Sequence, residues 1–435
     1  MRQFSNKIYF IIPPTSHRLI PGREFILSAP LEGVCSISLV LGKMGYNVEI
    51  VDYRRCQKNL IRDFERSLSD ACAICITTTI DSFDFLVNFT RHVKQLQKDI
   101  PIVLGGSLVS SSPLVVLKNT EADVAVIGEG ESTVKELFPL FGEKVSHKIK
   151  EVKGIYYKDS SGKVLKNPPR KHLTNLDNLP VLDFGIWTIN NGYKFDKISY
   201  STTRGCPWNC FFCFKPMQGL RCKSRERIEE EISNAKEKYN IKEIVFTDST
   251  FNFSSTHIES ICEILQDYDI KWTCMMRAQN VNQSLLRKMK NAGCKSIRYG
   301  IETLNQDILT SLKQGIQASD IENTINMTIE QGIKVVGFFM IGLPGATEES
   351  LIKMIDFVEK KKQLIPKAFY FIPLPGSRLY GSALRNSLIK DESEYLYLLS
   401  QGTDRLIINF SNIPEHKLRK TFRRMEAIMK ERLCS

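Results

Sequence analysis

The chain has 435 residues, a formal net charge of +12 and twelve cysteines. This length exceeds what one hydrophobic core normally reaches, so we expect two domains and a tail. The longest apolar segment, VVGFFMIGLPG from Val335, is shorter than the roughly 20 residues of a membrane-spanning helix. The apolar run at 8–12 is too short for a signal peptide. We therefore predict a soluble cytoplasmic protein with no membrane span.

Residues 1–143 alternate short apolar runs with helix-compatible segments. The runs are KIYFIIPP, NVEIVDY, ACAICITTT, PIVLGG and ADVAVIGEG. Because continuous apolar runs are typical of parallel strands covered on both faces, we predict an open, Rossmann-like α/β layer. Residues 144–195 follow as a connector, with a small hairpin in GIYYKDSSGKVLKNP and a proline-containing strap in NLDNLPVLDFGIW.

Small and polar residues follow three of these apolar runs. In chain order they are Thr78 and Thr79, then Gly105, Gly106 and Ser107, then Gly128, Glu129 and Gly130. Open α/β sheets bind ligands beyond the carboxyl ends of their strands, where glycine lets the backbone approach a ligand closely. Taken alone, these residues leave open both a ligand edge and a set of ordinary turns.

Residues 196–385 restart the alternation. Their strand candidates are KISYSTT, EIVFTDS, KWTCMM, KSIRYGIE, KVVGFFMIG and AFYFIPL, separated by helical segments such as RERIEEEISNAKEKY. Six parallel strands with intervening helices predict a partial (β/α)6 barrel, in which the chemistry lies at the carboxyl ends of the strands.

Residues 386–435 are predicted to form a mostly helical tail. The last segment, PEHKLRKTFRRMEAIMKERL, has apolar residues at helical spacing, so one face can pack while the basic face meets solvent. Contact of the basic face with an acidic substrate, a carrier protein or RNA is the alternative.

Three cysteines are crowded into GCPWNCFFC, directly after the first strand of the second domain. In a reducing compartment such a group indicates metal rather than disulfides. Cys206, Cys210 and Cys213 can hold three irons of a [4Fe-4S] cluster, whose fourth iron then takes a non-protein ligand. A structural zinc site is the alternative, but it normally has four protein ligands, and the nearest further cysteine is Cys222.

At these residues the sequence resembles the radical S-adenosylmethionine (SAM) superfamily. It matches the C-x₃-C-x₂-C signature with an aromatic residue, Phe212, before the last cysteine, and the resemblance assigns Phe212 to the SAM contacts. The resemblance implies that SAM chelates the open iron and is split by one electron into methionine and a 5′-deoxyadenosyl radical. The cofactors then carry the chemistry, while the protein positions and shields them.

Four strand ends supply further candidates for SAM contacts. By this resemblance, Asp248 holds the SAM amine, Arg277 its carboxylate and Glu302 its ribose or amine, and Gly342 lies near the adenine. Each charged residue has an ordinary alternative. Asp248 is also a suitable helix N-cap, and Arg277 and Glu302 are suitable members of ion pairs at the rim of a barrel.

An ordered set of motifs extends the resemblance to radical SAM enzymes with a cobalamin-binding domain. The set is PP after the first strand, GYNVEIVDY, VLGGSLVS, VAVIGEGESTVKELF, GIYY and LDNLPVLDF. The resemblance implies that cobalamin binds between the domains, and it assigns to cobalamin the eight residues between Thr78 and Gly130 named above. The D-x-H-x-x-G motif that often supplies a cobalt ligand is absent, and His17 lacks its context, so we expect cobalamin without a histidine ligand.

The resemblance implies a methyltransferase that acts on an unactivated carbon of a natural product, lipid or peptide. An inert carbon is no nucleophile and cannot attack SAM directly. Hydrogen abstraction would make it a radical, which could then take the methyl group from methylcobalamin. A cobalamin-dependent rearrangement, cyclisation or ring contraction remains open, as does a tRNA methylthiotransferase-like activity. A non-catalytic sensor would lack the SAM residues, so an enzyme is favoured. Expected partners are a small-molecule or peptide substrate and an external electron donor such as flavodoxin or ferredoxin, with no nucleic acid.

Overall fold

The computed structural model describes residues 6–15, 29–55, 58–142, 147–189, 194–217, 219–313, 315–402 and 404–434. The chain divides into two units. The first unit consists mainly of Arg23–Phe195 with Ile389–Gly402, and the second mainly of Asp196–Leu388 with Thr403–Ser435. The residues expected to form one tail at 386–435 are therefore divided between both units.

The first unit contains a seven-stranded sheet in the order β2-β1-β3-β4-β5-β6-β7. Its strands are β1 Lys7–Ile12, β2 Asn47–Asp52, β3 Ala71–Thr78, β4 Ile102–Gly106, β5 Val124–Val126, β6 Ile155–Lys158 and β7 Val164–Lys166. The first five strands are parallel, which confirms the predicted α/β layer. Strands β6 and β7 form the hairpin of the connector and extend this sheet antiparallel to β5, so the connector is not a separate body.

Helices surround the first sheet. They are α2 Glu32–Lys43, α3 Lys58–Arg66, α4 Phe83–Leu96, α5 Ser107–Ser111, α6 Pro113–Asn119, α7 Glu131–Leu137, α8 Ile186–Ile189 and α16 Glu392–Ser400. Helix α4 buries Phe83, Leu86, Phe89 and Val93, whose spacing of three or four residues places them on one face. Helix α16, from the C-terminal part of the chain, packs against α4 and α6.

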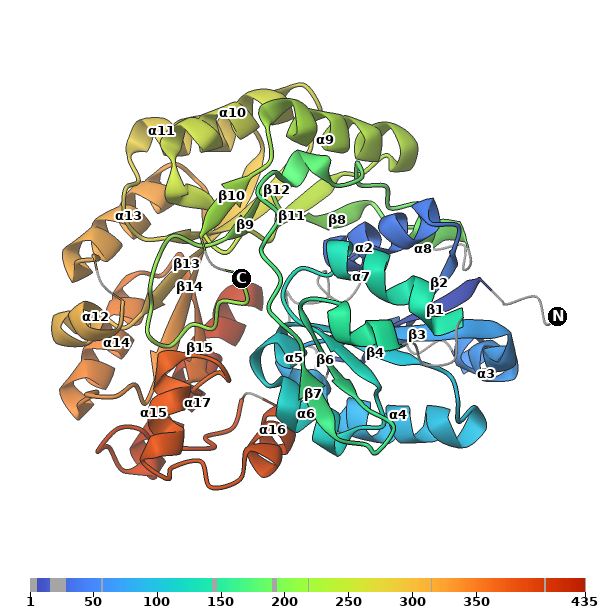
Figure 1. Ribbon diagram of the computed structural model, residues 1–435. Helices are drawn as coiled ribbons and strands as arrows, with labels where there is room; N and C mark the ends of the chain where they lie inside the picture. The colour runs from blue at the N-terminus through green and yellow to red at the C-terminus, as the bar shows by residue number, and fades with distance from the viewer. Residues whose placement is uncertain are drawn as a thin grey trace. The chain divides into compact units, whose positions relative to one another are not determined.

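The second unit contains six parallel strands in the order β15-β14-β13-β12-β11-β8 (Figure 1). They are β8 Lys197–Tyr200, β11 Glu243–Phe246, β12 Lys271–Arg277, β13 Cys294–Glu302, β14 Lys334–Ile341 and β15 Leu364–Tyr370. This is the predicted partial barrel. Two short strands, β9 Thr203–Gly205 and β10 Leu220–Cys222, form a separate antiparallel ribbon.

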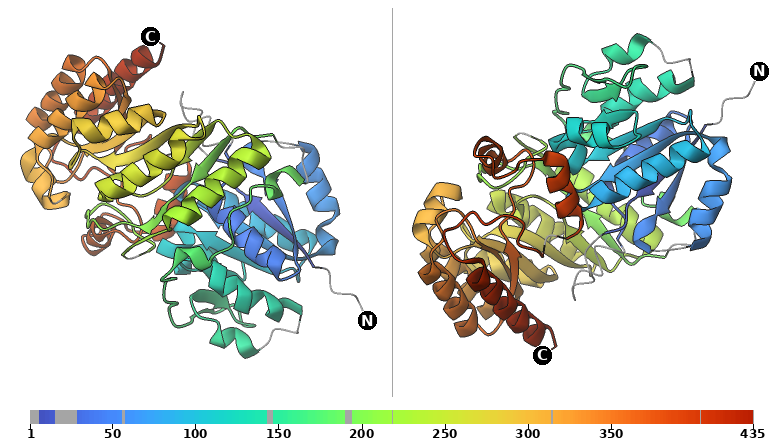
Figure 2. Two further views of the ribbon diagram at one scale, coloured as in Figure 1. Left: turned by 90° about the horizontal axis from the view of Figure 1, so that it is seen from above. Right: turned by 90° about the horizontal axis from the view of Figure 1, so that it is seen from below.

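The helices described in the second unit are α9 Arg225–Tyr239, α10 Ser255–Gln266, α11 Gln283–Asn291, α12 Gln306–Leu312, α13 Ala318–Glu330, α14 Glu348–Lys360, α15 Arg378–Arg385 and α17 Glu415–Cys434. Most of them lie on one side of the sheet. Figure 1 shows α9, α10, α11 and α13 along the outer side. Helix α17 packs on β15 and α14 (Figure 2, right, dark red), so the apolar side of the basic last segment is buried as expected.

The two faces of the second sheet differ in burial. On β12, Trp272 and Met276 are buried beneath the helices, whereas Met275 is 36% exposed. Strand β14 alternates in the same way along its whole length. The second sheet is therefore covered mainly on one face, unlike the first sheet.

Among the helices in the described residues, none is both long and apolar enough to cross a membrane.

Candidate functional site

The cysteine loop joins the two strands of the β9–β10 ribbon. Gly205 at the end of β9 has a φ of +90°, and a Cβ there would collide with the carbonyl oxygen of Gly219. Glycine is therefore required where the chain turns into the loop. Cys206 and Cys210 are half-buried, and Cys213 is exposed.

Main-chain hydrogen bonds hold the middle of the loop. The Phe211 amide donates to the Leu312 carbonyl over 3.0 Å, and the Leu379 amide donates to the Phe211 carbonyl over 3.3 Å. Leu312 ends α12, and Leu379 lies in the first turn of α15. Phe212, a predicted SAM contact, is buried. Two helix ends thus fix the segment between the second and third cysteines.

Arg277, the last residue of β12, contacts this loop. Its Nη1 donates to the Cys210 sulfur over 3.5 Å, and its Cζ lies 4.3 Å from the centre of the Trp208 ring. The buried guanidinium also donates through Nη2 to Gln279 Oε1 and to the Lys313 carbonyl. Burial raises the pKa of the Cys210 thiol, and the charges of Lys313 and Arg277 act against that rise. Arg277 therefore favours a thiolate at Cys210.

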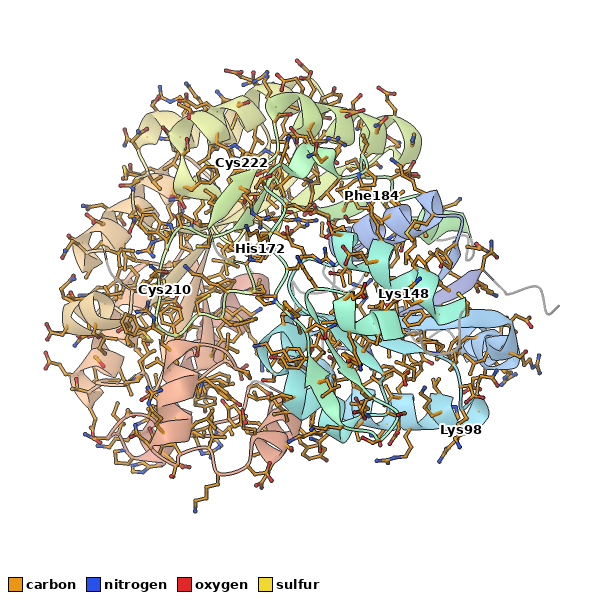
Figure 3. All side chains as sticks on the ribbon, viewed as in Figure 1. Lys98, Lys148, His172, Phe184, Cys210 and Cys222 are labelled. Atoms are coloured by element: carbon orange, nitrogen blue, oxygen red, sulfur yellow. The ribbon has the colours of Figure 1, made fainter. Side chains whose placement is uncertain are left out.

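The donor set of the loop fits an iron–sulfur cluster. Each cysteine of such a cluster binds a different iron, so the three sulfurs need not meet at one point. Within the described ranges, no three His, Cys, Asp or Glu side chains are grouped as ligands of a single ion. Cys222 lies on β10 opposite Thr203, outside the loop. Figure 3 shows it well apart from Cys210.

Asp248 follows β11 and is buried. Its Oδ1 accepts hydrogen bonds from the Thr202 hydroxyl at 2.9 Å, the Thr202 amide at 3.1 Å and the Thr203 hydroxyl at 2.6 Å. These bonds turn the chain after Tyr200, which explains why the predicted strand KISYSTT is split into β8 and β9. The contacts to Thr202 and Thr203 position the start of the cysteine loop. A contact of Asp248 with SAM stays a prediction.

His257 supports the same corner. Its Nε2 lies 2.8 Å from the Thr202 hydroxyl, and burial lowers the pKa of the imidazole to about 4. The ring is therefore neutral near pH 7 and holds the hydroxyl that bonds to Asp248. No sequence motif predicts this role for His257, since the residue lies inside α10, away from any strand end.

Glu302 ends β13 in a strained conformation. Its φ is +65°, which costs a non-glycine residue about 1–2 kcal/mol. The buried carboxylate pairs with Lys313 Nζ at 3.0 Å, and the same ammonium group donates to the Gly300 carbonyl. Backbone strain of this kind concentrates at functional sites. Glu302 stands in a strand-end motif and was predicted, whereas Lys313 was not, because it follows α12 and belongs to no such motif.

Gly342 follows β14 with a φ of +84°, a conformation that favours glycine. A Cβ at this position would lie 3.5 Å from the Leu418 side chain on α17. The glycine therefore allows a tight turn beside the last helix. Its predicted place near adenine is not tested by these contacts.

The carboxyl ends of β1, β3, β4 and β5 meet at one edge of the first sheet. In the strand order 2-1-3-4-5, the chain runs outward in one direction from β1 to β2 and in the other direction from β3 to β5. The point between β1 and β3 where the direction changes is the usual ligand position in such sheets. Gly106 has a φ of +109°, and a Cβ there would lie 2.5 Å from the Thr78 carbonyl oxygen. A Cβ at Gly105 would meet nothing within 4 Å. The structure thus brings Thr78, Gly105 and Gly106 together and leaves space at Gly105 for a ligand.

The second glycine turn lies next to the first. The Ser110 hydroxyl donates to the Gly106 carbonyl at 2.7 Å and accepts from the Gly128 amide at 3.0 Å. Sequence analysis missed this bridge because Ser110 lies inside a helix. Ser107 begins the same helix, α5, and its hydroxyl donates to the Thr78 carbonyl at 3.4 Å. A single network therefore joins the ends of β3, β4 and β5.

Glu129 binds to its own chain. Its Oε2 accepts from the Leu173 amide at 3.0 Å and lies 3.3 Å from His172 Nδ1, so it holds the start of the strap. At Gly130 a Cβ would press on the Ile37 side chain at 2.9 Å. Thr79 caps the turn before α4 by bonding to Ser82. These three positions have structural roles, and their contacts with cobalamin stay predictions. His17 lies outside the described residues.

Family comparisons match both halves of the chain. Residues 30–138 match the family model described as B12 binding domain, and residues 200–358 match the one described as Radical SAM superfamily. The two domains occur together in this chain, in the order that the sequence motifs predict.

Individual relatives match most of the chain. An uncharacterized methyltransferase of Pyrococcus horikoshii is 29% identical over 88% of this chain and 84% of its own length. A protein of Methanocaldococcus jannaschii, provisionally named a methylthiotransferase, is 25% identical over 85% of this chain and 80% of its own.

The fold is similar to that of solved structures. One example is the radical S-adenosylmethionine methyltransferase TsrM from Kitasatospora setae, with cobalamin and a [4Fe-4S] cluster bound. The TM-score is 0.70 at 16% identity, and the match covers 88% of this chain and 75% of that chain. The similarity supports the fold of both units.

Proposed function

We propose that this chain, which belongs to the radical SAM enzymes with a B12 binding domain, transfers a methyl group to a carbon atom of a small organic substrate. The presence of both domains in one chain carries this proposal. A radical SAM domain takes a [4Fe-4S] cluster and SAM, and a B12 binding domain takes cobalamin. An inert carbon cannot attack SAM directly, so a radical and a separate methyl carrier serve the same reaction.

The cysteine loop is proposed to hold the cluster through Cys206, Cys210 and Cys213. The proposed SAM contacts are Phe212, Asp248, Arg277, Glu302 and Gly342. Cobalamin is assigned to the edge that contains Thr78, Thr79, Gly105, Gly106, Ser107, Gly128, Glu129 and Gly130. When bound, these cofactors supply the radical and the transferable methyl group.

The protein's own residues position the cysteine loop and the end of β13, and they adjust the reduction potential of the cluster. Arg277 keeps a positive charge beside the Cys210 sulfur, and hydrogen bonds to cluster sulfurs adjust the reduction potential. Asp248 fixes Thr202 and Thr203 before the loop. The pair of Glu302 and Lys313 fixes the end of β13. The electron needed for SAM cleavage would come from an external donor such as flavodoxin or ferredoxin.

Methylthiolation is a second candidate because of the Methanocaldococcus jannaschii relative. The cysteines of β3 do not favour it. Both cysteines belong to β3, and Cys75 is buried in the core of the first sheet. A cobalamin-dependent rearrangement without methyl transfer is the third candidate.

A labelling experiment separates the three candidates. The protein would be produced with cobalamin, purified without oxygen, and analysed for corrinoid by extraction and mass spectrometry; we expect about one per chain. Reduced enzyme would then receive SAM deuterated in its methyl group and a small-molecule extract. Transfer of the deuterated methyl alone supports methylation, and transfer together with sulfur supports methylthiolation. SAM cleavage with an unlabelled product would support a rearrangement and contradict our proposal.

A further inference from the structure

The inner face of the second sheet, opposite its outer helices, differs from an ordinary core. Along β13, Tyr299 points outward, since its hydroxyl lies 2.9 Å from the Thr328 hydroxyl on α13. Arg298 therefore points inward, and its Nη2 donates to the inward Thr273 hydroxyl at 3.4 Å. Arg298 is half-buried, so part of this side chain is accessible to solvent.

A second cation lies two strands away on the same face. On β15, Tyr370 stacks on Phe422 of α17 and so points outward. Phe369 points inward, and so does Lys367, whose Nζ lies 5.5 Å from the centre of the Phe369 ring. Two strand spacings separate β13 from β15, or about 10 Å. A molecule that contacts both cations therefore has to span this distance across β14.

Apolar side chains lie between and around the two cations. Phe338 on β14 is paired in register with Lys367, and its ring meets the Phe369 ring edge-on at 5.8 Å. Met275 and Met340 extend this surface and are exposed and half-buried, respectively. The acid at the carboxyl end of β13, Glu302, is engaged by Lys313. The inner face of β12 to β15 thus carries two cations, Arg298 and Lys367, among apolar side chains.

We infer that this face binds the substrate and that the substrate is an organic anion with an apolar body. Arg298 and Lys367 would bind a carboxylate or phosphate group by charge-assisted hydrogen bonds. Phe338, Phe369, Met275 and Met340 would contact the apolar part. The inference rests on the proposed function only in taking the bound anion to be the substrate.

Ligand-observed NMR can test this inference with defined probes. The probes are phenyl phosphate and phenylacetate, which share an aromatic ring but differ in the anion, and neutral benzyl alcohol. We expect at least one anion to bind the cluster-loaded protein more tightly than benzyl alcohol does. In R298Q/K367Q, binding of that anion should weaken about tenfold or more. The anion bound more tightly distinguishes phosphate from carboxylate recognition.

A matched variant controls for lost charge. R225Q/K288Q removes two cations from the outer helices, where Arg225 pairs with Glu263 and Lys288 with Glu259 on the surface. This variant should bind the probes as the wild type does, and both variants should unfold near the wild-type temperature. Equal anion binding by R298Q/K367Q and wild type, or no anion binding by wild type, would overturn the inference.

The same preparations separate this inference from the proposed function. SAM binding and 5′-deoxyadenosine formation would be measured without substrate in all three proteins. If R298Q/K367Q loses SAM binding but keeps anion binding, the cations serve SAM and the inference is overturned. If the wild type binds the anion but holds no corrinoid, the proposed methyl transfer fails while the substrate class stands.

Discussion

The two sheets of this protein are buried in different ways. Strand β1 of the first sheet is buried at five successive residues, whereas β14 of the second alternates between buried and half-buried positions. The first sheet is covered on both faces, and its proposed cobalamin edge lies at the carboxyl ends of its strands. The second sheet is covered mainly on one face, and its inner face is the proposed substrate surface. The two proposals thus assign binding to an edge in the first sheet and to a face in the second.

The largest expected effect tests whether the iron–sulfur cluster and cobalamin bind to different units of the chain. Changing Cys210→Ala should abolish the cluster and all SAM cleavage, because one of three thiolate ligands is lost. Corrinoid binding should persist, since its proposed residues belong to the other unit. Iron content, the electron paramagnetic resonance signal and 5′-deoxyadenosine formation would measure the loss.

Cys222→Ala is the matched control for that change. Cys222 lies on β10 outside the loop, so this variant should keep its iron and its SAM cleavage. Unchanged SAM cleavage in the Cys210 variant would disprove the cluster assignment.

Adjacent methionines on β12 test the two faces of the second sheet. Met276 is 2% exposed and Met275 is 36% exposed. Met276→Ala should lower the free energy of unfolding by about 2–5 kcal/mol through a lost core contact. Met275→Ala should change it by less than about 1 kcal/mol. Denaturant unfolding of the second unit would compare them, and similar losses would contradict the one-sided burial.

Adjacent glycines test the ligand edge of the first sheet. Gly106→Ala should cost about 1–3 kcal/mol of stability, because φ is positive and the Cβ would meet the Thr78 carbonyl. Gly105→Ala has open space, so it should leave thermal unfolding unchanged while reducing corrinoid content. Full corrinoid content in a folded Gly105 variant would remove this glycine from the proposed cobalamin site.

The smallest expected effect concerns the tuning of the cluster. Arg277→Met removes a positive charge beside the Cys210 sulfur, so the reduced, more negative cluster should become less stable. The midpoint potential should fall by some tens of millivolts, at a similar iron content. A redox titration followed by electron paramagnetic resonance would measure the change. An unchanged potential would show that Arg277 does not tune the cluster and would leave it the contacts with Trp208, Gln279 and Lys313.

Sequence patterns predicted most strands in their order along the chain and the position of the cysteine loop after the first strand of the second unit. Local signals sufficed there, because strand hydrophobicity and cysteine spacing are read within a few residues. The split after Tyr200 was not predictable, since it depends on Asp248, which is 46 residues from Thr202. Lys313 and His257 were missed for the same reason. Their roles arise only when distant strands bring their partners together.

The sequence also did not show which face of the second sheet carries charged side chains. Arg298 stands in the predicted strand KSIRYGIE, and Lys367 directly precedes the predicted strand AFYFIPL. Neither pattern indicated which face these cations occupy, and the alternation on β14 shows that one face of this sheet is half-exposed. A run of apolar residues does not say what covers each face, because that depends on where the helices pack.

Helix α16 has a consequence for synthesis on the ribosome. It follows the last strand of the second unit, yet its Leu396 and Leu399 are fully buried in the first. Asn119 on α6 also donates to the Ser393 hydroxyl of α16 at 3.0 Å. Domains generally fold from the N-terminus as the chain emerges. In this protein the surface of α4 and α6 stays uncovered until α16 has been synthesised, near the end of the chain. A nascent or truncated chain that ends near residue 195 would therefore expose this apolar surface to chaperones.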